Sequence, residues 1–219
     1  MNLVFSMCIV VRRLRLVVLA AAIVVPVLAQ AQTQGVVVDR LLAVVNGDVV
    51  TLSDVRAARR LRLIPGAAML DDDGLVTQLI ERRLMLAELA KYAPSAPTLE
   101  LITVRRQAWA QSLPSGTDVP KALVSAGISE PTLMAWLRDD LRIAAYLDQR
   151  FTAAAQPTRD QALTYFREHE AEFAVGGVTP EFATVETEVR RRVAASRRAA
   201  RIREWIDAIS LRAEIRRPK

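Results

Sequence analysis

The side chains that most often carry enzyme chemistry are scarce in this sequence. His169 is the only histidine of the 219 residues, and it stands between Glu168 and Glu170 in a stretch with the composition of an exposed helix. The only cysteine, Cys8, lies in a leader segment that we expect to be removed. These counts exclude cysteine–histidine nucleophilic pairs and metal sites built from several histidines. No Gly-rich phosphate loop and no G-x-S-x-G motif occurs.

The aspartates do not form a catalytic or metal-binding group either. Asp139 and Asp140 are neighbours on a predicted helix, where adjacent side chains point about 100° apart, so they cannot share one face. Asp71, Asp72 and Asp73 precede a helix, whose N-terminus favours caps and negative charge. We interpret this run as helix caps, with a metal site as the alternative. The sequence therefore predicts no cofactor, no metal site and no enzyme activity.

Flexible and aromatic apolar side chains are the remaining functional candidates. Methionine suits a groove that accepts varied partners, because its side chain adapts to irregular surfaces. The candidates for contact with an apolar polypeptide are Met69, Met85, Trp109, Met134 and Trp136. Core packing is the alternative for each of them, and it is the commoner fate of such residues. Met85 is the best candidate, because we expect it to project from the polar side of a central helix.

The first 31 residues have the pattern of a secretory signal peptide. Three arginines precede an apolar run over 16–28, and Ala-Gln-Ala at 29–31 provides a small-x-small cleavage site. A membrane anchor is the alternative, but the run is shorter than the roughly 20 residues of a spanning helix. Met7 is an alternative start. We expect residues 32–219 to be exported, with no thiol, no disulfide and no stable membrane insertion.

The charge of the chain is mildly positive. The sequence has 30 basic and 24 acidic residues, a formal net charge of +6. Removing the three leader arginines leaves 27 against 24, a net charge of +3, which does not indicate a nucleic-acid partner. Arginines concentrate in the last predicted helix, for example at Arg190, Arg191 and Arg192. A solvated helix face and attraction to an anionic partner are the two interpretations.

A hairpin followed by a helix is predicted after the leader. Apolar, largely β-branched residues run from Val36 to Val45, and Asn46-Gly47 is typical of a type I′ turn. Asp48–Val50 supplies a short return strand, and Thr51 can cap the helix that follows. A two-stranded ribbon is only marginally stable. We therefore expect the strand-like segment Ala213–Arg216 to pair with it and to close the chain into one domain.

Apolar periodicity and capping residues predict that the rest of the chain is helical. The helix over 75–91 has an apolar face wider than a surface helix needs, so we expect it to be central. Arg83 falls within that face, and we expect its long side chain to extend to the edge of the face, where its charge can reach water. Thr158 and Gln161 form a capping box for a helix that we expect to reach Phe173. The predicted helices span residues 53–64, 75–91, 98–112, 118–126, 129–151, 158–173 and 180–211.

Five segments resemble the SurA-type periplasmic chaperones, a group related to trigger factor and to parvulin-linked chaperones. The residues that carry the resemblance are VVVDRLLAVVNGDVVTLSDV at 36–55, LVTQLIERRLMLAEL at 75–89, SEPTLMAWLRDDLRIAAYLDQR at 129–150, YFREHEAEF at 165–173, and the final helix with AEIR at 213–216. The first segment is the most specific. The resemblance implies a mainly α fold, a helical SurA-like core in which the C-terminal strand joins a small N-terminal hairpin.

The resemblance also implies a domain organisation. A signal peptide at 1–31 would precede one chaperone domain at 32–219. That domain would contain an N-terminal part, a satellite helix, and a C-terminal helix with its strand, at 36–152, 158–173 and 180–216. Many family members carry parvulin-type prolyl isomerase modules before the C-terminal helix. Here only the seven residues Ala174–Pro180 occupy that place, so we expect no such module and carry over no catalytic residue.

Family members hold unfolded outer-membrane polypeptides in an apolar groove in the periplasm. The resemblance therefore implies an ATP-independent periplasmic chaperone, a holdase, whose partners are unfolded polypeptide clients such as outer-membrane proteins. Two alternatives remain: an active prolyl isomerase of the same family, and a non-catalytic envelope adaptor that docks through the arginine-rich helix.

Overall fold

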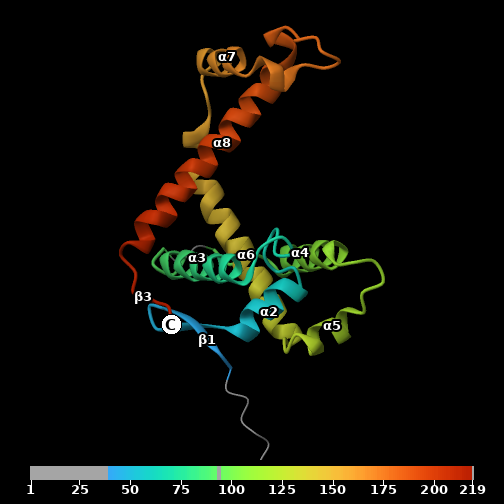
Figure 1. Cartoon of the computed structure of the whole chain (residues 1–219), viewed down its shortest axis with the longest axis vertical. Helices are drawn as coiled ribbons and strands as arrows, with labels where there is room; N and C mark the ends of the chain where they lie inside the picture. Colours follow the sequence, from blue (N-terminus) through green and yellow to red (C-terminus); the bar gives the residue numbers. More distant parts are fainter. Residues whose placement is uncertain (1–38, 93–94, 219) are drawn as a thin grey trace, which may run out of the picture. The chain divides into compact units, whose positions relative to one another are not determined.

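The architecture was determined as a computed structural model, which describes residues 39–92 and 95–218 (Figure 1). The predicted signal peptide and the first part of the predicted strand, residues 36–38, lie outside the described residues. Contacts group Asp39–Lys219 into one unit. Its described part contains seven α-helices and one three-stranded antiparallel sheet, which confirms the predicted mainly α fold.

The sheet joins segments from opposite ends of the chain. β1 (Leu41–Val45) pairs antiparallel with β2 (Asp48–Thr51), and its other edge pairs with β3 (Ile215–Arg216), which gives the order β2-β1-β3. Asn46 and Gly47 have φ angles of 51° and 93°, as a type I′ turn requires. The return of the C-terminal strand to the hairpin is therefore confirmed, although Asp39 and Arg40 of the predicted strand precede β1.

Asn46 connects the hairpin turn to the C-terminal segment. Its N–H donates to the Glu214 carbonyl, and its side-chain Oδ1 accepts from the Glu214 N–H, both at 2.9 Å.

Replacing Asn46 with alanine is expected to lower the free energy of unfolding by about 2 kcal/mol. Half of this loss comes from the lost hydrogen bond, and half from the cost of holding alanine in the left-handed backbone conformation. Asn46→Gly, which keeps that backbone, should lose only about 1 kcal/mol in urea unfolding. Equal losses for both variants would contradict the strain contribution.

The first two helices begin at the predicted caps. The Thr51 hydroxyl accepts from the Asp54 N–H at the start of α2 (Leu52–Arg60), and the Asp54 carboxylate accepts in return from the Thr51 N–H. The helix ends before the predicted Ile64, because Arg62 adopts a left-handed conformation with φ of 48°. Asp71 caps α3 (Asp72–Ala90) by accepting from the Gly74 N–H, which confirms the capping interpretation.

The remaining helices follow the predicted order, with one exception. They are α4 (Leu99–Ser112), α5 (Val119–Ser125), α6 (Glu130–Phe151), α7 (Arg159–Glu168) and α8 (Phe182–Ser210), with short 3-10 helices η1 (Ala153–Ala155) and η2 (Glu170–Phe173). The prediction of one helix reaching Phe173 is wrong, because α7 ends at Glu168. His169 leaves the helical conformation there, with φ of −131°, and its ring nitrogen Nδ1 lies 2.9 Å from the Tyr165 carbonyl.

Three groups of buried side chains organise these elements. The main core joins the sheet, α3, α6 and the C-terminal half of α8, which contributes Trp205, Ile206 and Ile209. A second core joins the end of α2 to α4, α5 and α6, and a third joins α7 to the N-terminal half of α8. The position of α7 along that half of α8 can be followed in Figure 1. None of the helices in the described ranges is long and apolar enough to cross a membrane.

Candidate functional site

The end of α2 holds α4 and α5 through their C-terminal carbonyls. Arg62 Nη1 donates to the carbonyl of Ser112, the last residue of α4, at 2.8 Å, and Arg60 donates to the carbonyl of Ser125, the last residue of α5. Cations favour these positions because a helix C-terminus carries partial negative charge. Trp109 Nε1 adds a buried hydrogen bond to the Leu61 carbonyl at 2.7 Å. These contacts fix α4 relative to α2.

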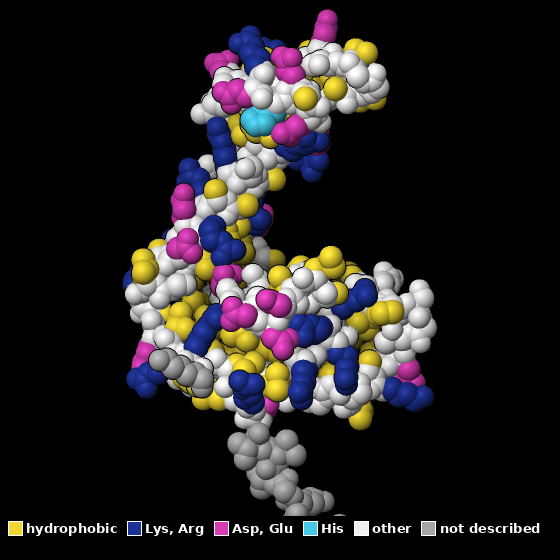
Figure 2. All heavy atoms as spheres, in the orientation of Figure 1, with side chains coloured by type: hydrophobic (Ala, Val, Ile, Leu, Met, Phe, Trp, Pro, Cys, Tyr) yellow, Lys and Arg dark blue, Asp and Glu magenta, His cyan; other side chains and the backbone are white. Residues whose placement is uncertain are grey.

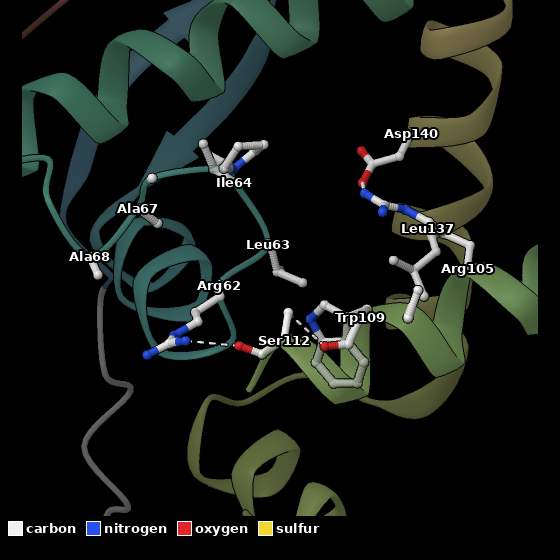
Figure 3. Close-up of a pocket in the computed structure, with 13 residues that line it drawn as sticks. Arg62, Leu63, Ile64, Ala67, Ala68, Arg105, Trp109, Ser112, Leu137 and Asp140 are labelled. Atoms are coloured by element: carbon white, nitrogen blue, oxygen red, sulfur yellow. Dashed lines mark hydrogen bonds and ion pairs between the residues drawn. The ribbon is translucent and has the colours of Figure 1, made fainter. Parts of the chain in front are cut away.

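A cavity of about 440 Å³ opens between α4, α6 and the turn that follows α2 (Figure 3). Most of its lining is apolar, and the polar side chains in it include Arg105 and Asp140. The residues that line it are Arg62, Leu63, Ile64, Pro65, Gly66, Ala67, Ala68, Arg105, Ala108, Trp109, Ser112, Leu137 and Asp140. A second cavity of about 490 Å³ is lined by Ser95, Pro97, Leu101, Leu141, Arg142, Ala144, Ala145, Asp148 and Arg198.

The two cavities lie on the same flank of the same two helices. On α4 the lining residues Leu101, Arg105 and Ala108 follow one another at spacings of four and three residues, which places them on one helix face. On α6, Leu137 and Asp140 line the first cavity, and Leu141 and Ala144 line the second. Leu141 and Ala144 each follow a residue of the first cavity by four positions, so these residues also share one helix face. We refer to the two cavities together as the α4–α6 trench, although they have no lining residue in common.

The trench has the length of a short extended peptide. Its α6 wall runs from Leu137 to Asp148, which corresponds to roughly 16 Å at the rise of an α-helix. An extended chain rises about 3.3 Å per residue, so roughly five residues would occupy this length. Leu101 of α4 lines the second cavity and is 52% exposed. The trench therefore combines a polypeptide-sized length with an apolar side chain open to solvent.

A buried ionic cluster borders the first cavity, through Arg105 and Asp140. Arg82 Nη1 donates to Asp140 Oδ1 at 2.6 Å and Arg82 Nη2 donates to the Trp136 carbonyl at 3.0 Å. The guanidinium also lies 3.9 Å from the centroid of the Trp136 ring, a cation–π contact. On the trench side, Arg105 Nη2 is 3.6 Å from Asp140 Oδ2. Burial raises the pKa of the Asp140 carboxyl, although the positive charges of Arg82 and Arg105 act in the opposite direction.

The other side of this cluster faces a smaller cavity of about 310 Å³. Arg82, Trp136 and Asp139 are among the residues that line it, and Leu63 lines both this cavity and the trench. The Trp136 Nε1 atom is buried and has no hydrogen-bond partner among the described residues. The Arg82–Asp140 pair therefore lies between two cavities: Arg82 lines the smaller cavity, and Asp140 lines the first cavity of the trench.

The five predicted contact residues are dispersed over the structure. Trp109 is buried, with 4% of its surface exposed, and lines the trench cavity of Figure 3. Trp136 is half-buried and lines the smaller cavity. Met69 is 91% exposed and follows Ala68 of the trench wall. Met85 is half-buried against the main core, and Met134 is half-buried on α6. Neither of these two methionines lines the trench.

The arginine inside the apolar face of α3 is not the predicted one. Arg82 is buried, with 7% of its surface exposed, whereas Arg83 is half-exposed and lies 3.5 Å from the Asp54 carboxylate at the edge of the helix.

The predicted divergence of the side chains of Asp139 and Asp140 is confirmed. Asp140 faces Arg82, and Asp139 accepts a hydrogen bond from Arg142 at 3.2 Å. Arg105 and Asp140 were not predicted as trench residues, and only the spacing of Leu101, Arg105 and Ala108 could have indicated that face.

Comparison with known proteins supports the fold. No family model and no curated protein matches this sequence. Among solved structures, the chain is similar to one from a study of PEB4 and Cj1289, described as structurally related SurA-like chaperones of Campylobacter jejuni. The similarity has a TM-score of 0.54 at 12% sequence identity and covers 83% of this chain and 100% of that chain. The fold is SurA-like. At this identity the comparison establishes the fold and leaves the function to be argued from the site.

In this SurA-like fold, a short turn connects η2 to α8. Val175 and Val178 exchange two backbone hydrogen bonds, at 3.0 and 3.2 Å, across Gly176-Gly177. Both glycines have positive φ angles, of 63° and 83°, which glycine adopts without steric penalty. The turn spans the place at which the resemblance would put an isomerase module.

Three consecutive arginines of α8 in this SurA-like fold have carboxylate partners. Arg190 lies 3.7 Å from Glu186, Arg191 lies 2.7 Å from Glu188, and Arg192 lies 3.3 Å from Glu172. Figure 2 shows basic and acidic side chains interspersed along this helix. The pairing favours the interpretation of a solvated face over a surface that attracts an anionic partner. No group of three or more metal-ligating side chains gathers within residues 39–92 and 95–218.

Proposed function

We propose that this protein is an ATP-independent holdase that binds unfolded polypeptides in the α4–α6 trench. The observation that carries the proposal is the trench itself, two open, mainly apolar cavities that together follow α6 over the length of roughly five extended residues. Contiguous apolar surface left exposed on a folded protein commonly marks an interaction site. The SurA-like fold supports the same conclusion, since the similar structure is described as a chaperone.

Weak apolar binding provides a release mechanism without a nucleotide. A client segment gains free energy by transferring its apolar side chains from water to the trench. When the client folds, those side chains enter its own core, and mass action then favours dissociation. Met69 is the methionine best placed to contact such a segment, because it is exposed beside the trench wall at Ala68. Its flexible side chain would accommodate clients of different sequence.

The leader pattern and the family resemblance support more specific parts of the proposal. Cleavage after Ala31 would release residues 32–219 into the periplasm as one chaperone domain. Outer-membrane polypeptides would then be the clients, because they cross this compartment unfolded. Trp109 and Trp136 would act mainly through packing, since their rings belong to or lie against the buried cores.

The proposal is tested by light scattering of a denatured outer-membrane protein diluted into buffer with and without this protein. Suppression of aggregation is the expected result, and no suppression at several-fold molar excess would refute the holdase function.

Replacing Leu101, which is 52% exposed in the trench, with serine should weaken client binding several-fold. The reason is the loss of about 1 to 2 kcal/mol of transfer free energy from burying the leucine side chain against the client. Val124→Ser is the matched control, since Val124 is 81% exposed on α5 and lines no part of the trench.

A further inference from the structure

Arg105 and Asp140 present an unusual pair of groups to an otherwise largely apolar trench. Figure 3 shows their side chains beside one another, reaching toward the space between α6 and the turn that carries Ile64. The Arg105 side chain is 44% exposed and the Asp140 side chain is 20% exposed. A hydrogen-bond donor and an acceptor are therefore accessible in the first cavity of the trench, which both side chains line.

The two groups are not saturated by each other. Arg105 Nη2 lies 3.6 Å from Asp140 Oδ2, which is longer than a hydrogen bond. Asp140 uses its other oxygen, Oδ1, for the 2.6 Å hydrogen bond from Arg82. Arg82 thus holds the carboxylate in place from behind, while Oδ2 and the Arg105 guanidinium remain directed toward the trench.

We propose that Arg105 and Asp140 bind the main chain of an extended client, with Arg105 donating to a peptide carbonyl and Asp140 Oδ2 accepting from a peptide N–H. This inference rests on the proposed holdase function and specifies how the trench recognises its client. In an extended chain the N–H and C=O of one residue point to the same side, as in the paired residues of an antiparallel ladder. One client residue can therefore satisfy both groups.

The charges around the pair favour a neutral amide over an ion. A client carboxylate that approached Arg105 would also approach the Asp140 carboxylate and be repelled by it. A client ammonium group that approached Asp140 would meet Arg105 and Arg82. A peptide group carries a donor and an acceptor without net charge, so it complements both partners. The same amide chemistry occurs in asparagine and glutamine side chains.

Main-chain binding also matches the shape of the trench. In an extended segment the residues immediately before and after the bound residue point to the same face, so both side chains can turn toward the apolar lining of the trench. Hydrogen bonds to the main chain contribute affinity that is independent of sequence, and the cavities add a preference for apolar side chains. A holdase for many unfolded clients requires this combination.

The experiment measures binding of short fluorescent peptides of Phe, Val, Thr and Ala, blocked at both ends, to the full-length protein by anisotropy. Arg105→Met keeps the apolar stem and removes the donors, so binding is expected to weaken about tenfold, the value of one hydrogen bond to a charged group. The factor should be the same when Asp, Glu, Asn or Gln is introduced into the peptide. Arg106→Met is the matched control, because Arg106 pairs with Glu130 and lines no part of the trench.

A change in the peptide tests the same contact without altering the protein. N-methylation of one central residue removes the peptide N–H that would donate a hydrogen bond to Asp140 Oδ2. This change is expected to weaken binding of the peptide to the unaltered protein. Binding that is insensitive both to Arg105→Met and to N-methylation would overturn the main-chain inference while leaving the holdase function intact. A loss confined to peptides with carboxylate or side-chain amide groups would overturn it as well. If the blocked peptides do not bind the unaltered protein at all, the proposed function fails too.

Discussion

Replacing Arg82 with methionine is expected to lower the free energy of unfolding by about 3 kcal/mol, because the change leaves a buried carboxylate without its closest cation. The Arg82 side chain is 8% exposed and donates both to Asp140 and to the Trp136 carbonyl. Arg105 remains 3.6 Å from Asp140 and compensates only in part. Urea unfolding followed by circular dichroism measures the loss.

The loss should depend on pH in a defined direction. Burial already raises the pKa of the Asp140 carboxyl in the folded protein, and removing Arg82 raises this pKa further. The folded state of the variant therefore binds a proton more readily than the unfolded chain does. Destabilisation is then full above the folded-state pKa and diminishes as the pH falls through it. Unfolding curves at about pH 7 and about pH 5 should show the smaller loss at the lower pH.

Two further variants control this prediction. Arg83→Met removes the neighbouring half-exposed arginine, which lies 3.5 Å from Asp54, and should lower stability by less than about 1 kcal/mol. The double replacement of Arg82 by methionine and Asp140 by leucine should recover most of the loss, because no unpaired charge stays buried. Equal losses for Arg82→Met and Arg83→Met would contradict the assignment of Arg82 as the buried partner.

Features that depend on three or four neighbouring residues were predictable from the sequence. Asn46-Gly47 forms the expected turn, and Thr51, Asp71, Ser129 and Thr158 all cap the helices that follow them. In each cap a side-chain oxygen accepts from a backbone N–H three residues later, so the sequence contains the whole interaction. The pairing of the C-terminal strand with the hairpin was predictable for a different reason. The short ribbon needed a third strand, and the chain offered few segments with strand character.

Features that depend on contacts between distant helices were not predictable. Apolar residues occupy so much of the surface of α3 that periodicity does not show which of Arg82 and Arg83 points inward, although the two side chains point about 100° apart. Asp140, which identifies the inward arginine, is 58 residues away in sequence. The trench is likewise absent from any local pattern, because it forms only where the flanks of α4 and α6 meet the turn after α2.

Replacing Trp109 with alanine is expected to lower the free energy of unfolding by about 4 kcal/mol, through lost apolar burial and the cavity that remains. Trp109 is 4% exposed and packs in the second core with Leu61 and Leu133. Trp109→Phe retains most of that burial and loses the Nε1 hydrogen bond to the Leu61 carbonyl, so it should lose about 1 to 2 kcal/mol. Thermal and urea unfolding of both variants measure the two contributions separately.

Trp136→Phe is the matched control, because the Trp136 Nε1 atom has no hydrogen-bond partner to lose among the described residues. Its stability should stay within about 1 kcal/mol of the unaltered protein, since the weaker cation–π contact with Arg82 is offset by removing a buried unsatisfied donor.

Trp109 lines the trench but supports it from the core. Trp109→Phe should therefore bind client peptides normally under conditions in which it is folded. A Trp109→Ala variant that keeps its stability but loses client binding would instead identify Trp109 as a contact residue.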